Sequence, residues 1–173
     1  SLEIIESIET LKGKGPLDLT KLSLELTGGM IYLAGLSTGH KKGIQMAKKA
    51  LESGEGLKKF KELIISQGGL AKIVDNPNLL PLAKNQSVLS SPNSGWIKSI
   101  NALTVGQLIT RLGGGRKKKE NIIDMGVGFL FEKTVGQKVK KGDPIVRVFY
   151  NDNQKEIIEE IKADLSQSIN FTS

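Results

Sequence analysis

The 173-residue chain contains 38% hydrophobic and 25% charged residues, which is enough apolar material for an ordinary protein core. It has no cysteine and one histidine, so disulfides, thiolate catalysis and multi-histidine metal sites are excluded. No stretch approaches the roughly 18 apolar residues of a membrane span, and the chain opens on an acidic helix pattern instead of a secretory signal. We therefore expect a cytoplasmic protein with no membrane partner.

The charge balance is basic, with 25 lysine and arginine against 18 acidic residues and a net charge of +7. Such a balance attracts nucleic acid, phosphate-bearing ligands or acidic partners. Aromatic residues make up only 5% of the chain, and no run interleaves them with basic residues as a stacking surface for nucleic acid requires. We interpret the charge as a lysine-rich surface and expect no nucleic-acid partner.

The first half of the chain is predicted to be helical, because its apolar residues recur with helical spacing. We expect helices over residues 2–12, 17–36 and 40–52, and a fourth that carries Leu57, Phe60 and Ile64. The second helix has an apolar stripe that we expect to be buried, formed by Leu19, Leu22, Leu26, Met30 and Leu33. The pair Gly28-Gly29 within it indicates a close helix contact or a bend. Short helices of this kind are typical of part of a larger helical layer, since their stripes need a partner surface.

The second half is predicted to be rich in strands, which makes the chain an α+β protein. Residues 70–86 resemble a linker, and we place a domain boundary near Lys84. Strands are expected over 87–90 and 95–100, joined by a turn, and a helix over 103–112. Val127, Phe129 and Phe131 alternate as in a half-buried strand, and a lysine-rich turn bracketed by Gly136 and Gly142 leads to a strand over 145–150. A final amphipathic helix is expected to contain Ile157, Ile158, Ile161, Leu165 and Ile169.

Gly113, Gly114 and Gly115 followed by Arg116 and Lys117 to Lys119 form a basic glycine loop that invites a phosphate-binding interpretation. The P-loop pattern GxxxxGK[ST] is absent, however, and three glycines after a helix more often end the helix and form a loop. We favour that interpretation.

The remaining polar candidates are weak. Asp124 and Asp143 are expected to cap turns or pair with lysine, and His40 to be a surface residue with no carboxylate near it in sequence. The serines lack a nucleophile-elbow context. The residues alone therefore predict no active site, and no catalytic or substrate-binding residue.

Six segments in order resemble one family: SLEIIESIETLKGKGP (1–16), AKKALESGEGLKKF (47–60), QGG (67–69), LGGGR (112–116), Asp124 with VGF (127–129), and VGQKVKKGDPI (135–145). Together they are similar to the C-terminal part of the pyrimidine-nucleoside phosphorylases, the family that includes thymidine phosphorylase. The resemblance spans almost the whole chain. Each segment by itself is a weak signal, but the ordered set is specific.

The resemblance implies a homodimeric, cytoplasmic enzyme that cleaves uridine, thymidine or deoxyuridine with inorganic phosphate as co-substrate, giving the free base and a pentose 1-phosphate. It implies that residues 1–84 supply helices of an α/β catalytic domain. Residues 85–173 would then form a barrel-sandwich hybrid module with a terminal helix. Scaffolding and cleft closure are the roles expected of this part.

The family's phosphate loop, catalytic histidine and pyrimidine-binding residues have no counterpart in this chain, which begins at Ser1 and reads as a piece of something longer. The chain is therefore expected to be inactive without the missing N-terminal portion, which would be its partner. The resemblance carries over one position: Glu6 matches a glutamate of the family's potassium site, and the other ligands would lie upstream. Several oxygen ligands are needed to hold such an ion, so Glu6 alone is expected to bind it poorly.

Two non-enzymatic alternatives remain open. The segment GQKVKKGDPIVRV (136–148) resembles the hairpin region of biotinyl and lipoyl carrier domains, although no lysine stands in an MKM or DKA context. A basic nucleic-acid-binding module is the other alternative, and a steep salt dependence of oligonucleotide binding would distinguish it.

Overall fold

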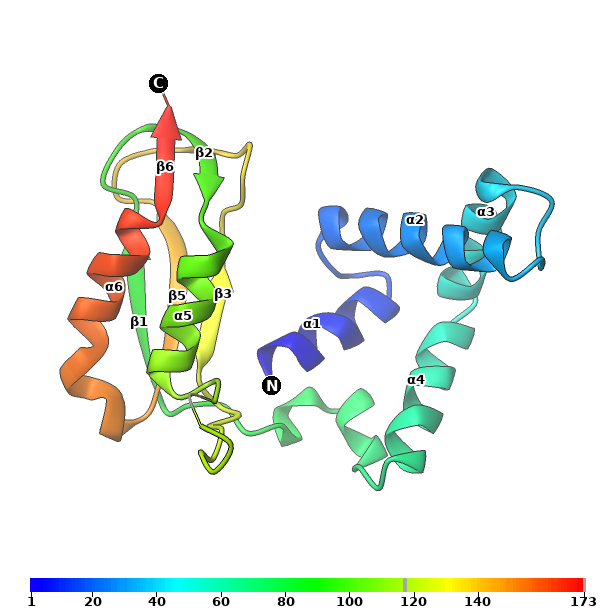
Figure 1. The fold of residues 1–173 in the computed structure, drawn as a ribbon, viewed down its shortest axis with the longest axis horizontal. Helices are drawn as coiled ribbons and strands as arrows, with labels where there is room; N and C mark the ends of the chain where they lie inside the picture. Colours follow the sequence, from blue (N-terminus) through cyan, green and yellow to red (C-terminus); the bar gives the residue numbers. More distant parts are fainter. Residues whose placement is uncertain (117, 173) are drawn as a thin grey trace. The chain divides into compact units, whose positions relative to one another are not determined.

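A computed structural model describes residues 1–116 and 118–172 of the chain (Figure 1). The chain divides into two compact units, one made of residues 1–2 and 81–173 and the other of residues 3–80. We call them the sheet unit and the helical unit. Within the described residues, no helix combines the length and apolar character needed to cross a membrane.

The helical unit is built from the helices that the periodicity predicts. They are α1 (Leu2–Leu11, which begins in the sheet unit), α2 (Leu17–Leu33), α3 (His40–Glu52) and α4 (Glu55–Ser66), followed by the 3₁₀ turns η1 (Ala71–Val74) and η2 (Pro77–Leu79). α2 ends earlier than expected, because Gly35 takes a left-handed backbone with φ of 72°. Pro77 stands at the first position of η2, where its missing N–H costs no hydrogen bond.

The glycine pair in α2 marks a close helix contact, as predicted. A Cβ added to Gly28 would lie 2.4 Å from Cγ1 of Ile44 in α3, and one added to Gly43 would lie 2.2 Å from the Gly28 carbonyl oxygen. The backbones of α2 and α3 therefore approach at Gly28 and Gly43, and only glycine fits at both positions.

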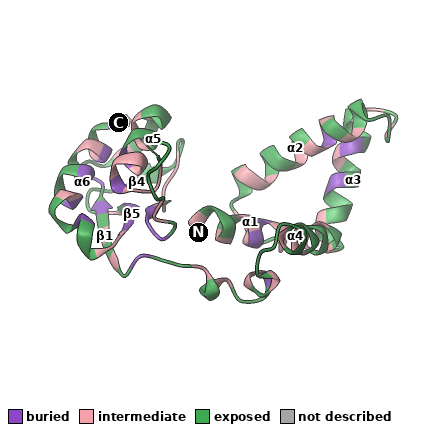
Figure 2. Ribbon diagram, turned by 60° about the horizontal axis from the view of Figure 1, so that its bottom comes forward, coloured by how far each residue is buried: buried purple, intermediate pink, exposed green. Residues whose placement is uncertain are grey.

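The expected burial of the α2 stripe is wrong for this chain. Leu22, Leu26, Met30 and Leu33 are between 56% and 84% exposed, and Figure 2 shows most of α2 as exposed or intermediate. α2 instead turns the Gly28 side toward α3, because the small residue allows the close approach there. These four side chains are left without a cover among the described residues, whereas Leu19, the first residue of the stripe, is partly buried.

The sheet unit contains two three-stranded antiparallel sheets, with strand orders β1-β5-β3 and β4-β2-β6. The strands are β1 (Asn85–Ser90), β2 (Gly95–Ile100), β3 (Gly128–Phe131), β4 (Lys138–Val139), β5 (Pro144–Tyr150) and β6 (Ile169–Thr172). Its helices are α5 (Ala102–Leu112), η3 (Asp152–Ile157) and α6 (Ile158–Gln167). The mixed helix and sheet content confirms the α+β class.

Three details differ from the sequence expectations. β1 and β2 are joined by a turn but belong to different sheets, because β5 and β6 are their antiparallel partners. The lysine-rich stretch is more than a turn, since β4 within it pairs with β2. Ile169 was expected in the last helix, but α6 ends at Gln167 and Ile169 begins β6 opposite Ile100.

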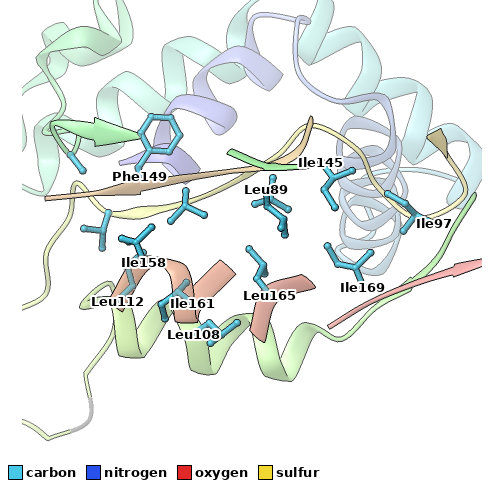
Figure 3. Packing of buried hydrophobic residues seen from close by; sticks show 14 of the residues in the cluster. Leu89, Ile97, Leu108, Leu112, Ile145, Phe149, Ile158, Ile161, Leu165 and Ile169 are labelled. Atoms are coloured by element: carbon cyan, nitrogen blue, oxygen red, sulfur yellow. The ribbon is translucent and has the colours of Figure 1, made fainter. Parts of the chain in front are cut away.

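The core of the sheet unit lies between its helices and strands (Figure 3). Leu108 and Leu112 of α5 and Ile161 and Leu165 of α6 are at most 5% exposed. They belong to one apolar cluster with strand residues that include Leu89, Ile97, Ile145 and Val148. This cluster holds both sheets and the loop after α5 in place.

Candidate functional site

The glycine run after α5 ends the helix, as predicted. Gly113 has a left-handed φ of 100°, its N–H donates to the Thr110 carbonyl at 3.2 Å, and the Gly114 N–H donates to the Ile109 carbonyl at 2.9 Å. A Cβ on Gly115 would lie 2.6 Å from Oγ1 of Thr110. Because the first two glycine amides are occupied by helix carbonyls, they are not available to cradle a phosphate.

The cations of the loop are exposed to solvent. Arg116, Lys118 and Lys119 form no ion pair with any residue that the structure describes, and Lys117 lies outside those residues. The Lys118 N–H donates to Oδ1 of Asn121 at 2.8 Å, which closes a turn. Ile122 follows this turn and is 95% exposed. The loop therefore exposes its cations and the apolar side chain of Ile122 to solvent.

Asp124 anchors the far end of the loop. Its carboxylate accepts hydrogen bonds from Nδ2 of Asn151 at 2.8 Å, from Nε2 of Gln154 at 3.4 Å and from the Gly126 N–H at 3.0 Å. Its own N–H donates to the Gly113 carbonyl at 2.9 Å, so both ends of the loop meet. Partial burial raises the pKa of the Asp124 carboxyl, but the hydrogen bonds outweigh this, and its pKa lies below the ordinary value. Asp124 is a turn-capping residue, as expected.

Asp143 has the same kind of role. Its Oδ2 accepts a hydrogen bond from the Lys140 N–H at 2.9 Å, which caps the turn between β4 and β5. Both aspartates are therefore used to hold loops, and neither faces a nucleophile or a base among its hydrogen-bond partners.

His40 is an exposed residue, as expected, and a carboxylate that is distant in sequence lies beside it. Nε2 of His40 lies 3.0 Å from the Glu25 carbonyl oxygen and 3.7 Å from Oε2 of Glu25. The contact between α2 and α3 brings these residues together across 15 positions, which a reading of neighbouring residues in the sequence misses. A histidine at a helix start with a single carboxylate beside it is a surface pair and carries no catalytic geometry of its own.

Glu6 lies on α1 and is exposed. Its backbone carbonyl accepts a hydrogen bond from Oγ1 of Thr10 at 2.7 Å. Within the described part of the chain, no group of three or more histidine, aspartate or glutamate side chains is placed to hold a metal ion. Glu6 is thus a single carboxylate, and its assignment as a cation ligand stays a prediction.

A polar hollow lies beside α5 and α6 in the sheet unit, with a volume of about 480 Å³. Arg111 and Asp164 line it, and the Arg111 guanidinium donates to the Asp164 carboxylate at 3.1 Å and also pairs with Glu160. These ion pairs raise the pKa of Arg111 and lower that of Glu160, mainly through the hydrogen bond between the two side chains. The hollow contains a satisfied ion-pair network and no nucleophile-base pair among its lining residues.

These observations define a class of protein: a small α+β module whose polar side chains cap and brace loops, together with a helical unit that leaves an apolar face open. Residues 96–169 match the family model of the pyrimidine nucleoside phosphorylase C-terminal domain. The chain belongs to the pyrimidine-nucleoside phosphorylase family and corresponds to its C-terminal part.

Several curated relatives named pyrimidine-nucleoside phosphorylase match this chain over all or nearly all of its length. The chain is 42% identical over all 173 residues to a pyrimidine-nucleoside phosphorylase of Staphylococcus epidermidis and 38% identical over 173 residues to one of Geobacillus stearothermophilus. It is 38% identical over 162 residues, 93% of the chain, to the protein of Bacillus subtilis. The chain spans only 39% of the length of the first two relatives and 37% of the third. These relatives are thus much longer than this chain.

Proposed function

We propose that this chain serves as the C-terminal part of an enzyme that cleaves pyrimidine nucleosides with inorganic phosphate. The substrates would be uridine, thymidine or deoxyuridine, and the products the free base and a pentose 1-phosphate. The observation that carries the proposal is the 42% identity to a pyrimidine-nucleoside phosphorylase over all 173 residues. Identity of this extent across both units favours the same fold and the same role in a larger enzyme.

In this proposal the chain contributes scaffold and cleft closure, and it is inactive alone. Two features support this role. Asp124 and Asp143 are committed to capping loops, and His40 is an exposed residue beside Glu25. Catalysis of such a displacement depends on positioned groups and electrostatic support, and the described residues assemble no such set. The chemistry is therefore assigned to the part of the relatives that this chain does not cover.

The arrangement that we propose places residues 1–84 in the catalytic α/β domain and residues 85–173 in a barrel-sandwich hybrid module, with two complete polypeptides forming a homodimer. The two antiparallel sheets of the sheet unit support the second assignment. The first is supported by the exposed apolar stripe of α2, Leu22, Leu26, Met30 and Leu33, because a contiguous apolar face of this kind is normally covered in the complete protein.

Potassium is a further part of the proposal. Glu6 would supply one hard oxygen ligand, and oxygen atoms from the uncovered part of the enzyme would supply the rest, since such ions take several ligands. The test is a thermal unfolding series of the complete enzyme in KCl and NaCl, with Glu6→Gln beside the wild type. A potassium-specific rise in Tm that Glu6→Gln abolishes supports the assignment, and an equal rise in both proteins contradicts it.

The proposed function is tested by complementation. A Geobacillus stearothermophilus phosphorylase truncated before the region that this chain matches is purified alone and after co-expression with this chain, and uracil release from uridine and phosphate is measured. We expect activity only from the co-expressed pair. Leu26→Lys on the exposed stripe should weaken the association, and Gln45→Lys at an exposed position of α3 serves as the control for added charge. Phosphorolysis by this chain alone, or no activity from a purified pair, would contradict the proposal.

The basic loop after α5 is proposed to pack near the cleft when the domains close, since glycine-rich loops are common mobile elements. Arg116 is its first cation, and it has no ion-pair partner among the described residues. In the complete enzyme, Arg116→Gln is expected to raise KM for phosphate. An unchanged KM for phosphate together with an unchanged kcat would contradict this part of the proposal.

A further inference from the structure

The sheet β4-β2-β6 has one face against the core and one face open, and a tryptophan of the central strand lies on the open face. Trp96 of the central strand is 45% exposed, whereas the next residue, Ile97, is 1% exposed and belongs to the core. In register, Trp96 stands opposite Lys138 of β4 on one side and Thr172 of β6 on the other. Side chains alternate between the faces of a strand, so Trp96 lies on the solvent side.

One lysine side chain lies over this tryptophan, and three more lysines are carried by β2 and by the turn after β4. Nζ of Lys138 lies 5.8 Å from the centre of the Trp96 ring. Lys98, Lys138, Lys140 and Lys141 are all exposed, and none of them forms an ion pair with a described residue. The neighbouring acid, Asp143, directs its carboxylate to the Lys140 N–H and leaves the lysine ammonium groups unpaired. The part of the sheet that carries the exposed ring is therefore rich in cations without an ion-pair partner among the described residues.

The turn that carries Lys140 and Lys141 is held beside β2. The Gly142 N–H donates to the Ser91 carbonyl at 2.8 Å, and the Ser91 N–H donates to the Asp143 carbonyl at 2.8 Å. The Lys141 N–H donates to Oγ of Ser94 at 3.0 Å. These bonds join the turn after β4 to the turn before β2, so the cations are presented at a defined place relative to Trp96.

We propose that this open face, Trp96 with Lys98, Lys138, Lys140 and Lys141, binds single-stranded nucleic acid. An unpaired base would stack on the Trp96 ring, and the lysines would contact the phosphates on either side of it. Proteins that bind single strands without sequence preference combine these two elements, an aromatic stacking surface and a cationic path for the backbone. The sequence alone does not reveal this combination, because Trp96 and Lys138 are 42 positions apart and only the pairing of β2 with β4 brings them together.

Charge and shape favour this occupant over the alternatives. An acidic peptide would satisfy the lysines but offers no flat π face for the exposed ring. Double-stranded DNA keeps its bases stacked inside the helix, so it would engage only the lysines. The inference does not depend on the phosphorylase proposal, because it uses only residues of the sheet unit.

Trp96 is the only tryptophan of the chain, so its fluorescence reports on this face alone. The test titrates the 173-residue protein with a 12-residue oligo(dT) at a series of NaCl concentrations. We expect saturable quenching of the fluorescence, with an affinity that falls as salt rises. For single strands the slope of log K against log salt is about −0.7 for each phosphate contact.

Variants separate stacking from charge, with binding followed by the anisotropy of a labelled oligo(dT). Trp96→Ala should weaken binding by about 5- to 100-fold, and Trp96→Phe should retain part of it. Lys138→Gln with Lys140→Gln should reduce the salt slope by about 0.7 per lysine. The matched controls are Tyr32→Ala, an exposed aromatic residue on α2, and Lys41→Gln with Lys42→Gln, an exposed pair on α3, and both should leave binding unchanged. Far-UV circular dichroism checks that each variant is folded.

Three results would overturn the inference. Oligo(dT) that causes no saturable quenching removes the stacking contact. A 12-base-pair duplex or poly-glutamate that binds as tightly as oligo(dT) means that the face attracts any polyanion. An equal loss of affinity from the Lys138 and Lys140 pair and from the control pair on α3 means that net charge, and not this face, is responsible.

Discussion

Nδ2 of Asn151 donates a hydrogen bond to Oδ2 of Asp124 at 2.8 Å, and this contact joins the loop after α5 to the start of η3. Asn151 also accepts a hydrogen bond from the Lys84 N–H at 3.1 Å, so it ties the segment before β1 to the same point. Gln154, which is buried, accepts a bond from the Asn151 N–H at 2.7 Å and donates to Asp124. One amide side chain therefore connects three segments that are distant in sequence.

Removing the Asp124 carboxylate should weaken the connection that Asn151 makes between these segments. We expect Asp124→Ala to lower the free energy of unfolding of the sheet unit by about 1–3 kcal/mol, because it leaves the side-chain amides of Asn151 and the buried Gln154 without an acceptor. Urea unfolding followed by Trp96 fluorescence measures this, since Trp96 lies in the same unit. Asp152→Ala is the control: that exposed side chain pairs with Lys155 and Asn85 at the surface, and its loss should cost less. Equal losses in the two variants would contradict the special role of Asp124.

The same carboxylate predicts a pH dependence. Burial raises the pKa of Asp124, but the hydrogen bonds from Asn151, Gly126 and Gln154 outweigh it and hold the folded-state pKa below the ordinary value near 3.8. A lowered folded-state pKa contributes stability that is present above the ordinary value and is lost as pH falls through the folded-state value. The difference in unfolding free energy between wild type and Asp124→Asn should therefore be constant from pH 7 to 5 and shrink below about pH 4. Urea titrations at pH 7, 5, 4 and 3 measure it, and a difference that grows on acidification would show that the sign is wrong.

The contact of α2 with α3 predicts that replacing a glycine by alanine has opposite effects on stability at Gly43 of α3 and Gly29 of α2. Gly43→Ala should destabilise the helical unit by about 1–3 kcal/mol, because its methyl group would clash with the backbone carbonyl of Gly28. Gly29→Ala should stabilise it by about 0.5–1 kcal/mol, since the nearest atom to its Cβ is 3.8 Å away and alanine is the better helix former. Thermal unfolding followed by circular dichroism at 222 nm compares the two. If Gly29→Ala is as destabilising as Gly43→Ala, the contact between the helices differs from the one described.

The exposed stripe of α2 predicts that the isolated chain binds apolar probes or associates with itself. Replacing both Leu26 and Met30 by lysine should lower the fluorescence of bound 1-anilinonaphthalene-8-sulfonate several-fold and shift the sedimentation profile toward the monomer, because the change removes the centre of an uncovered apolar surface. Lys41→Leu with Lys42→Leu on α3 makes the opposite change, because it adds exposed apolar surface. This variant should raise the fluorescence of the bound probe and shift the sedimentation profile away from the monomer. If the double lysine variant has the same sedimentation profile as the wild type, this stripe is not the surface through which the chain associates with itself.

Much of the local structure was predictable from the sequence. The bounds of α3, α5 and β2 follow closely from apolar spacing and from the glycines and prolines around them, because these signals act within a few residues. Asp124 and Asp143 were correctly interpreted as turn caps for the same reason. Ile169 was misassigned, since an apolar residue that follows an amphipathic helix continues its spacing equally well when the chain has already entered a strand.

Contacts between distant segments were not predictable in this way. The proximity of Glu25 to His40 depends on how α2 crosses α3, and the stripe of α2 was expected to be buried because an apolar spacing does not say which surface covers it. The sequence also indicated no aromatic residue among the cations, whereas the sheet places Lys138 over Trp96.

By itself, the sequence determined the α+β class, most helix bounds and the family resemblance, because each depends on local spacing or on ordered motifs. The tertiary structure alone decided which strands pair, which glycines meet, that Asn151 holds Asp124, and that Lys138 lies over Trp96 on an open sheet face. Those contacts arise from the packing of segments tens of residues apart, and a local pattern carries no information about the partner that another part of the chain will supply.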